Sequence, residues 1–382
     1  MSNNLMIASN EWMSRPADQR FETLDALSAK VNSRRNLSTA VDINVRDLHV
    51  ESRTIELTVE DKQVPSTQLI LNSGIAPASP THWSFGQLCR TTQLGSDTMR
   101  RLPTSIVADS LNYRLAKVEA PELKLMAIKD PEGEVNTLQA LTSRTYGRIW
   151  DADVVRSTQT LVERAAEAGK KFFNPKDWSG KSSGLYASDH DVFIFMIDGG
   201  SVVDVGWDQK GQPELLHRGF IVSNSEVGAA SFSLMTFMFR VVCGNHCIWG
   251  AKDVSELMIR HTSSGPARFE SEVMPTLRGY LDATAAPLEA AIKKAKGYLL
   301  PEKSDDLIKF LRAKNFSKGE IVDAINAAKT EEGDARTLWQ IVNGFTASAR
   351  QYAHIDTRLN LEKRAGALLD LVGKPGDLVV SN

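Results

Sequence analysis

The sequence predicts an α+β protein, in which a mixed, mostly antiparallel sheet with packed helices is followed by an all-helical region. Between residues 39 and 262, short apolar runs alternate with polar residues and are separated by polar turns, which is typical of antiparallel strands. From residue 268 to 373, apolar residues instead recur at helical spacing. We therefore divide the chain into an N-terminal arm and helix (1–38), an α+β core (39–265) and a helical C-terminal region (266–382).

The composition excludes several classes of protein. The 382-residue chain is 42% hydrophobic and 24% charged, as in ordinary globular proteins, and no apolar run approaches the roughly 18 residues of a membrane-spanning helix. The first residues, MSNNLMIASNEW, lack the basic region and apolar core of a signal peptide, and three cysteines do not suggest a disulfide framework. We expect a cytoplasmic protein with no membrane partner. Because the net charge is -2, nucleic acid can be bound only by a local basic patch.

The N-terminal third alternates between the two kinds of secondary structure. Helical spacing marks the first element, a period of two marks the next two, a short apolar run marks the fourth, and helical spacing then returns. Two strand patterns and a helix follow. In chain order, these predicted elements are 21–31, 41–45, 55–59, 69–71, 83–117, 123–128, 138–149 and 153–168.

The segment FGQLCRTTQLGSDTMRRL, within the second helical stretch, allows two interpretations. It fits a helix-turn-helix with Gly95 near the turn, in which Arg90, Arg100 and Arg101 contact phosphates. It also fits an ordinary pair of helices under a sheet, with the arginines on the solvated face. We adopt the second interpretation, because short matches of this kind are common by chance.

Basic residues are interleaved with aromatic ones in two places, at RTYGR (144–148) and at GKKFFNPKDWSGK (169–181). Such segments can bind a single strand, since bases stack on aromatic rings while cations follow the phosphates. The alternative is that Phe172 and Phe173 form a short buried strand, because neighbouring strand side chains point to opposite faces. The predicted nucleic-acid-binding residues are Arg144, Tyr146, Arg148, Lys170, Lys171, Phe172, Phe173, Lys176, Trp178 and Lys181.

Residues 184–206 predict a strand, a turn at Asp198-Gly199-Gly200 and a second strand. The run 192–197 is apolar almost throughout, so both of its faces should be covered. The neighbouring acidic and imidazole residues at 189–191 diverge on a strand and are not expected to share an ion.

The stretch from His217 to His261 is rich in apolar residues and holds most of the residues suited to chemistry. One hypothesis is a zinc site made by Cys243, His246, Cys247 and His261, although structural zinc ligands usually come as two close pairs. A second is an enzyme whose candidate catalytic residues are Cys243, His246, Glu226 and Asn224. We favour the interpretation that the cysteines are small buried hydrophobes. Accordingly we assign no catalytic residue, and we expect no metal and no cofactor.

The C-terminal region predicts a series of helices. Pro301 separates the first helical stretch from a short helix at 305–312, and Ser317 with Glu320 forms a capping box for the next. Apolar spacing then resumes from Leu338 to Tyr352 and around 359–369.

Several long motifs together resemble the family of unknown function numbered 932 (DUF932). They are GLYASDHDVFIFMID, RGFIVSNSEVG, FRVVCGNHCIWGA and RHT, followed by TLWQIVNGFTASAR and RLNLEKRAGALL, across about residues 84–373. The resemblance departs at Cys247, where an aliphatic residue is expected, and this weakens the zinc hypothesis. It implies a mobile-element setting, such as a phage or plasmid, but no reaction.

Three functions remain open. The leading hypothesis is a phage- or plasmid-encoded protein that binds or anneals single-stranded DNA in replication or recombination. A comparison with phage annealing proteins, which work as rings, is made at the level of fold alone. The alternatives are an enzyme with a Cys/His site in residues 217–261, and a structural or host-interaction protein that forms a homo-oligomer without a ligand.

Overall fold

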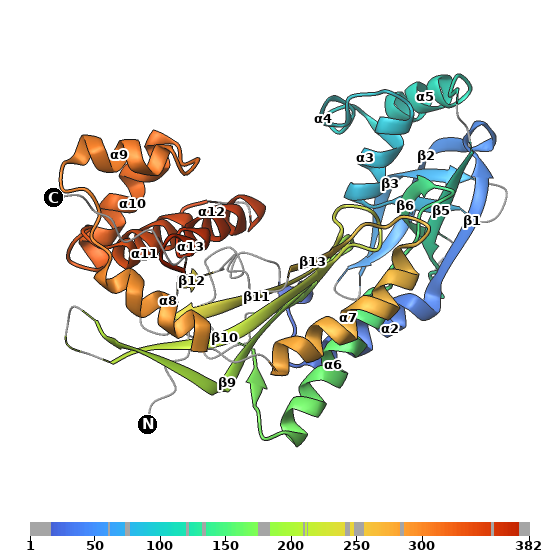
Figure 1. Cartoon of the computed structure of the whole chain (residues 1–382). Coiled ribbons are helices and arrows are strands. Elements are labelled where there is room, and N and C mark those ends of the chain that lie inside the picture. The colour runs from blue at the N-terminus through green and yellow to red at the C-terminus, as the bar shows by residue number, and fades with distance from the viewer. Residues whose placement is uncertain are drawn as a thin grey trace.

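The computed structural model describes residues 17–59, 62–72, 77–119, 122–131, 135–174, 184–208, 211, 213–240, 245–247, 256–282, 286–352 and 355–373. Figure 1 shows the N-terminal sheet and the C-terminal helices at opposite ends of the long strands β9, β10 and β11. The predicted α+β class is confirmed, but the strands divide between two sheets instead of forming one.

The N-terminal sheet has the strand order β1-β5-β6-β4-β3-β2, and all its pairings are antiparallel except β4 with β6. Helices α3 and α5 cover it with apolar residues that include Leu88 and Leu111. Its elements are β1 (Ser38–Asn44), η2 (Val45–Asp47), β2 (His49–Val59), β3 (Lys62–Asn72), β4 (Ala78–Pro80), α3 (His82–Thr91), α4 (Ser96–Met99), α5 (Thr104–Leu115), β5 (Glu122–Ile128) and β6 (Asn136–Ser143).

The second sheet has the strand order β12-β11-β10-β9-β7. In addition, β13 pairs with β11, and β8 pairs with β9. The predicted turn at 198–200 is wrong, because β9 continues through these residues and β7 pairs beside them. The strands are β7 (Phe172–Phe173), β8 (Leu185–Ala187), β9 (Val192–Trp207), β10 (Pro213–Asn224), β11 (Phe232–Arg240), β12 (Asn245–Cys247) and β13 (Glu256–Ile259).

Both faces of β9 are buried over residues 192–197, as the apolar run predicts. Ile194 and Met196 face a core formed with three helices, whereas Phe193 and Phe195 belong to an aromatic cluster on the opposite face. The helices on the first face are α2 (Leu24–Leu37), α6 (Asp151–Glu167) and α7 (Gly265–Asp282), and the short η1 (Ala17–Gln19) precedes them.

The C-terminal helices have their own core, which also includes Val203, Leu216 and Met238 from the second sheet. Every residue of α11 is buried, and the capping box predicted at Ser317 and Glu320 is confirmed at the start of α10. These helices are α8 (Ala286–Gly297), α9 (Ser304–Arg312), α10 (Lys318–Glu331), α11 (Leu338–Ala349), α12 (Ile355–Ala367) and α13 (Asp370–Gly373). Over the described residues, no helix has both the length and the apolar character that crossing a bilayer requires.

Candidate functional site

An arginine and a glutamate meet between the two sheets, where the loop after β6 (144–150) approaches the loop after β10 (225–231). We refer to this place as the junction and to the two segments as the junction loops. The side chains of Arg148 and Glu226 are each 9% exposed, and Arg148 Nε donates to Glu226 Oε2 at 2.9 Å. The other guanidinium nitrogens donate to Ser38 Oγ at 2.8 Å and Gln139 Oε1 at 3.2 Å. The guanidinium also lies 3.7 Å from the centre of the Trp150 ring. Arg148, predicted to contact nucleic acid, therefore has its donors engaged within the protein.

Two of the candidate catalytic residues hold the start of α6. Glu226 Oε1 accepts the backbone N–H of Asp151 at 2.6 Å, which satisfies one of the donors left open at a helix N-terminus. Asn224 Nδ2 donates to Asp151 Oδ1 at 2.8 Å and to the carbonyl of Ile149 at 2.9 Å. Burial, and then the neighbouring charge of Glu226, raise the pKa of Asp151 well above its usual range. These contacts give Glu226 and Asn224 a positioning role in the fold.

Tyr146 and His261 lie in the same junction. Their rings stack with centroids 5.2 Å apart, and the Tyr146 hydroxyl donates to the carbonyl of Ser225 at 3.1 Å. Burial lowers the pKa of His261, which favours the neutral imidazole, and raises the pKa of Tyr146. His261 therefore occupies one face of the Tyr146 ring, which the sequence suggested as a platform for a base.

The remaining described cations of the predicted basic set lie before and after α6: Arg144 precedes this helix, and the adjacent pair Lys170 and Lys171 follows it. Arg144 is exposed, with Nε 3.4 Å from Asp42 Oδ2. Lys170 Nζ donates to the carbonyl of Leu281, and Lys171 is exposed. Arg148 precedes the first residue of α6 and Lys170 follows its last, so the 17-residue helix separates them by about 25 Å.

The two phenylalanines of β7 face opposite sides of the second sheet, as strand alternation predicted. Phe172 packs against Phe220 and Tyr280 with ring centroids 5.4 and 6.3 Å apart, whereas Phe173 joins the aromatic cluster on the other face. Both rings pack against the sheet. Lys176, Trp178 and Lys181 lie outside the described residues.

Strand register separates the proposed cysteine and histidine site into two parts. His246 of β12 pairs opposite Phe239, near the end of β11, whereas Ile259 of β13 pairs opposite Phe232 at its start. Seven strand residues span about 24 Å, and His261 lies beyond Ile259. Cys247 also lies on β12, and Cys243 is outside the described residues.

The same register separates His246 from the other two candidate catalytic residues. Asn224 and Glu226 follow Ser223, which pairs opposite Ser233 near the start of β11. Within the described part of the chain, no three His, Cys, Asp or Glu residues form a group suited to a metal ion. The hypothesised zinc and catalytic sets are therefore not brought together.

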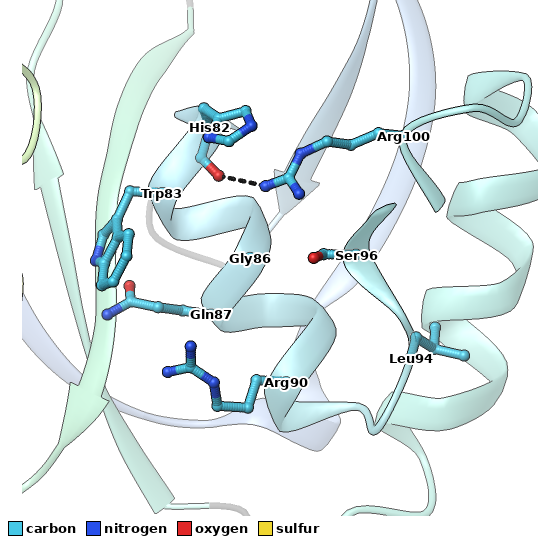
Figure 2. Close-up of a pocket in the computed structure, with 8 residues that line it drawn as sticks. All are labelled: His82, Trp83, Gly86, Gln87, Arg90, Leu94, Ser96 and Arg100. Atoms are coloured by element: carbon cyan, nitrogen blue, oxygen red, sulfur yellow. Dashed lines mark hydrogen bonds between the residues drawn. The ribbon is translucent and has the colours of Figure 1, made fainter. Parts of the chain in front are cut away.

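A cavity of about 380 Å³ lies over helix α3 and is hereafter the α3 pocket. Figure 2 shows Trp83 and Arg90 on one side of Gly86, and Arg100 and Ser96 on the other. Because Gly86 has no side chain, the helix surface is open between them. The lining residues are His82, Trp83, Gly86, Gln87, Arg90, Leu94, Ser96 and Arg100.

The two arginines of the α3 pocket differ from Arg148 in their exposure and in their hydrogen-bond partners. Arg90 is exposed. Arg100 is held in place, because Nη2 donates to the carbonyl of His82 at 2.8 Å and the guanidinium lies 5.2 Å from the centre of the Phe85 ring. Its Nη1 is 3.5 Å from Asp97, whose side chain is 93% exposed, so that ion pair is readily replaced by a ligand.

The pocket wall is built on the junction loop. Trp83 Nε1 and Gln87 Nε2 both donate to the carbonyl of Val227, at 3.0 and 2.9 Å, and Gln87 Oε1 accepts the N–H of Leu141. The Trp83 ring also stacks on His190 with centroids 6.1 Å apart. The loop that includes Glu226 therefore fixes the indole that borders the pocket.

Sequence reasoning identified part of this site. The helix-turn-helix interpretation named Arg90 and Arg100, but the structure supports the adopted alternative: α3 and α5 pack on the sheet, and α4 has only four residues. Trp83 was missed as a site residue, because its position depends on a carbonyl 144 residues away in the sequence. The available signal was the charge of residues 82–117, which contain five basic and two acidic residues in a chain of net charge -2.

The chain matches the family model described as Domain of unknown function (DUF932) over residues 141–366. The match covers more than half of the 382 residues, so the chain belongs to this family, as its motifs indicated. The matched range includes both junction loops and begins after the α3 pocket. Neither the curated proteins nor the solved structures gave a match.

Proposed function

We propose that the protein binds single-stranded nucleic acid in the cytoplasm, in the replication or recombination of a phage or plasmid, and that the α3 pocket receives one nucleotide. The observation that carries the proposal is the presence of two arginines and a tryptophan around a helix surface left open by Gly86. The mobile-element setting comes from what membership of the family implies.

The chemistry of the pocket suits a nucleotide. Guanidinium groups bind phosphate oxygens through charge-assisted hydrogen bonds, and an indole offers a stacking surface for any base. The volume of about 380 Å³ falls in the range of small-ligand sites, which is roughly 300–1,000 Å³. Because Arg100 is already held by His82 and Phe85, it loses little freedom when it binds an anion.

Fluorescence anisotropy with a labelled single-stranded oligonucleotide tests the proposal at low and moderate salt. Wild-type protein should bind, and affinity should fall as salt rises. Arg90→Ala and Arg100→Ala should each weaken binding about tenfold, and each should reduce the salt slope by about 0.7 if it removes one phosphate contact. Lys329→Ala, on the exposed side of α10, is the matched control and should leave both quantities unchanged.

Two results would count against this function. Failure of the wild-type protein to bind at either salt concentration ends the proposal. Equal losses in Lys329→Ala and Arg90→Ala would assign binding to diffuse charge and not to the pocket. Light scattering on the same samples reports the oligomeric state, so a defined multimer without binding would favour the structural alternative.

A further inference from the structure

Two further cavities lie on the N-terminal sheet beside the α3 pocket, and each cavity shares lining residues with the next. A cavity of about 430 Å³ shares His82 and Arg100 with the α3 pocket. A third cavity, of about 700 Å³, shares Gln68 and the segment 79–81 with the second. We refer to the second and third cavities together as the sheet groove, whose lining residues extend from α3 to Arg53 on β2.

The sheet groove exists because β3 and β4 diverge. They pair only at Leu71 and Ala78, and β4 has just three residues, one of which is Pro80 without an N–H donor. On this side of β3, residues 67–69 have no partner strand among the described residues and instead line the cavity. The gap therefore exposes backbone polar groups as well as side chains.

The groove wall is rich in groups that both donate and accept hydrogen bonds. Hydroxyl and amide side chains of this kind suit the edges of bases and the oxygens of sugars. The groove residues with such side chains include Thr67, Gln68, Ser79, Thr81, Thr104 and Asn136.

The far end of the groove carries a cation with unused donors. Arg53 Nε and Nη2 are shielded from solvent and make no hydrogen bond in the described structure, although Nε lies 3.6 Å from Glu51 Oε1 as an ion pair. The Arg53 side chain is 36% exposed, so the exposed part of its guanidinium can pair with an anionic oxygen in the groove. Glu56 and Asp130 also line this cavity, so a phosphate is favoured only on the Arg53 side.

We propose that a single strand of nucleic acid enters at the α3 pocket and continues through the sheet groove to Arg53. This inference rests on the proposed function and extends it from one nucleotide to a strand of several. Arginines then contact the strand at both ends, Arg90 and Arg100 at the pocket and Arg53 at the far cavity, while neutral polar groups line the path between them.

Anisotropy with oligothymidylates of increasing length tests the path. The key variant is Gln68→Glu, which keeps the size of the side chain and places a negative charge where the second and third cavities meet. Dinucleotides should bind this variant and the wild type equally, since they occupy only the pocket. Longer strands, within about 4–16 nucleotides, should bind the wild type more tightly and lose about tenfold in Gln68→Glu.

The controls distinguish failure of the groove as a path from failure of the pocket as a binding site. Gln351→Glu makes the same substitution at an exposed position beyond α11 and should bind like the wild type. Arg53→Ala should weaken binding of long strands alone. If long strands bind Gln68→Glu as tightly as the wild type, the groove is not the path and the pocket function stands. If no oligonucleotide binds the wild type, the proposed function itself fails.

Discussion

The junction and the α3 pocket both combine arginine with an aromatic ring, yet they use the arginine differently. At the junction, Arg148 is 9% exposed, is paired with Glu226 and lies over Trp150. At the pocket, Arg90 is exposed and Arg100 is held by a carbonyl and the Phe85 ring. Burial and partners, not residue type, therefore decide whether an arginine stabilises the fold or is open to a ligand.

The two regions are also physically coupled. The carbonyl of Val227, next to Glu226 in the junction loop, accepts hydrogen bonds from Trp83 and Gln87 of the pocket wall. The junction therefore fixes two side chains of the pocket wall. Substitution of a buried junction residue should therefore lower stability, whereas substitution of a pocket arginine should lower binding without a loss of stability.

The largest expected effect is at the buried ion pair. Glu226→Gln leaves the charge of Arg148 buried without a counter-charge, and breaking such a pair costs about 3–5 kcal/mol in the free energy of unfolding. Urea denaturation followed by circular dichroism measures this loss. Glu272→Gln, which breaks the exposed pair with Arg268 on α7, is the control and should leave the denaturation midpoint unchanged. Similar midpoints for both variants would show that the junction is not structural.

The next effect is a pH dependence at Asp151. Because folding raises the pKa of this carboxyl group, its stabilising contribution is complete below the unfolded value of about 3.9 and is lost as pH rises through the folded value. The unfolding free energy of the wild type minus that of Asp151→Asn should therefore fall as pH increases above about 4, by at most about 1.4 kcal/mol per pH unit. Denaturation curves of both proteins across this range provide the measurement, and a constant difference would refute the predicted titration.

A smaller effect should distinguish charge from geometry at the pocket. Arg100→Lys keeps the positive charge but loses the planar guanidinium that rests on Phe85 and donates to His82. It should weaken oligonucleotide binding about threefold, compared with about tenfold for Arg100→Ala. Anisotropy titrations at one salt concentration provide the comparison. Equal losses in the two variants would mean that the fixed geometry of Arg100, and not its charge alone, is required.

Effects of similar size are expected at Gly86. A Cβ atom here would lie 3.5 Å from Arg100 Nη2, an ordinary contact, and alanine is favoured over glycine within a helix by about 1 kcal/mol. Gly86→Ala should therefore raise the free energy of unfolding by up to about 1 kcal/mol. Gly86→Leu should fold equally well but obstruct the pocket, so it should lower oligonucleotide affinity. Unchanged affinity in the folded leucine variant would argue against the pocket as the binding site.

Local patterns in the sequence predicted much of the fold. Alternation assigned Phe172 and Phe173 to opposite faces, and the capping box at Ser317 and Glu320 marked a helix start. The division into two sheets was not predicted, because periodicity identifies strands but not their partners. The turn predicted at 198–200 failed for a similar reason: Asp198 pairs with β7, and β10 pairs with Ile197 and Val202 on either side of a register shift, so β9 continues through these residues.

The candidate site was predicted less completely, because it depends on contacts between distant segments. Sequence reasoning listed Tyr146, Arg148, Asn224, Glu226 and His261 under three separate functions, and folding brings them into one junction. Asp151 was not listed, since its environment arises only when Asn224 approaches it from 73 residues away.

Photocrosslinking tests the central claim most directly. A single-stranded oligonucleotide that contains bromodeoxyuridine would be bound to the wild-type protein, irradiated and mapped by mass spectrometry of the cross-linked peptides. We predict cross-links to Trp83 and to peptides from residues 65–104, which include the α3 pocket and part of the sheet groove. Cross-links confined to residues 169–181 or to the C-terminal helices would contradict this assignment.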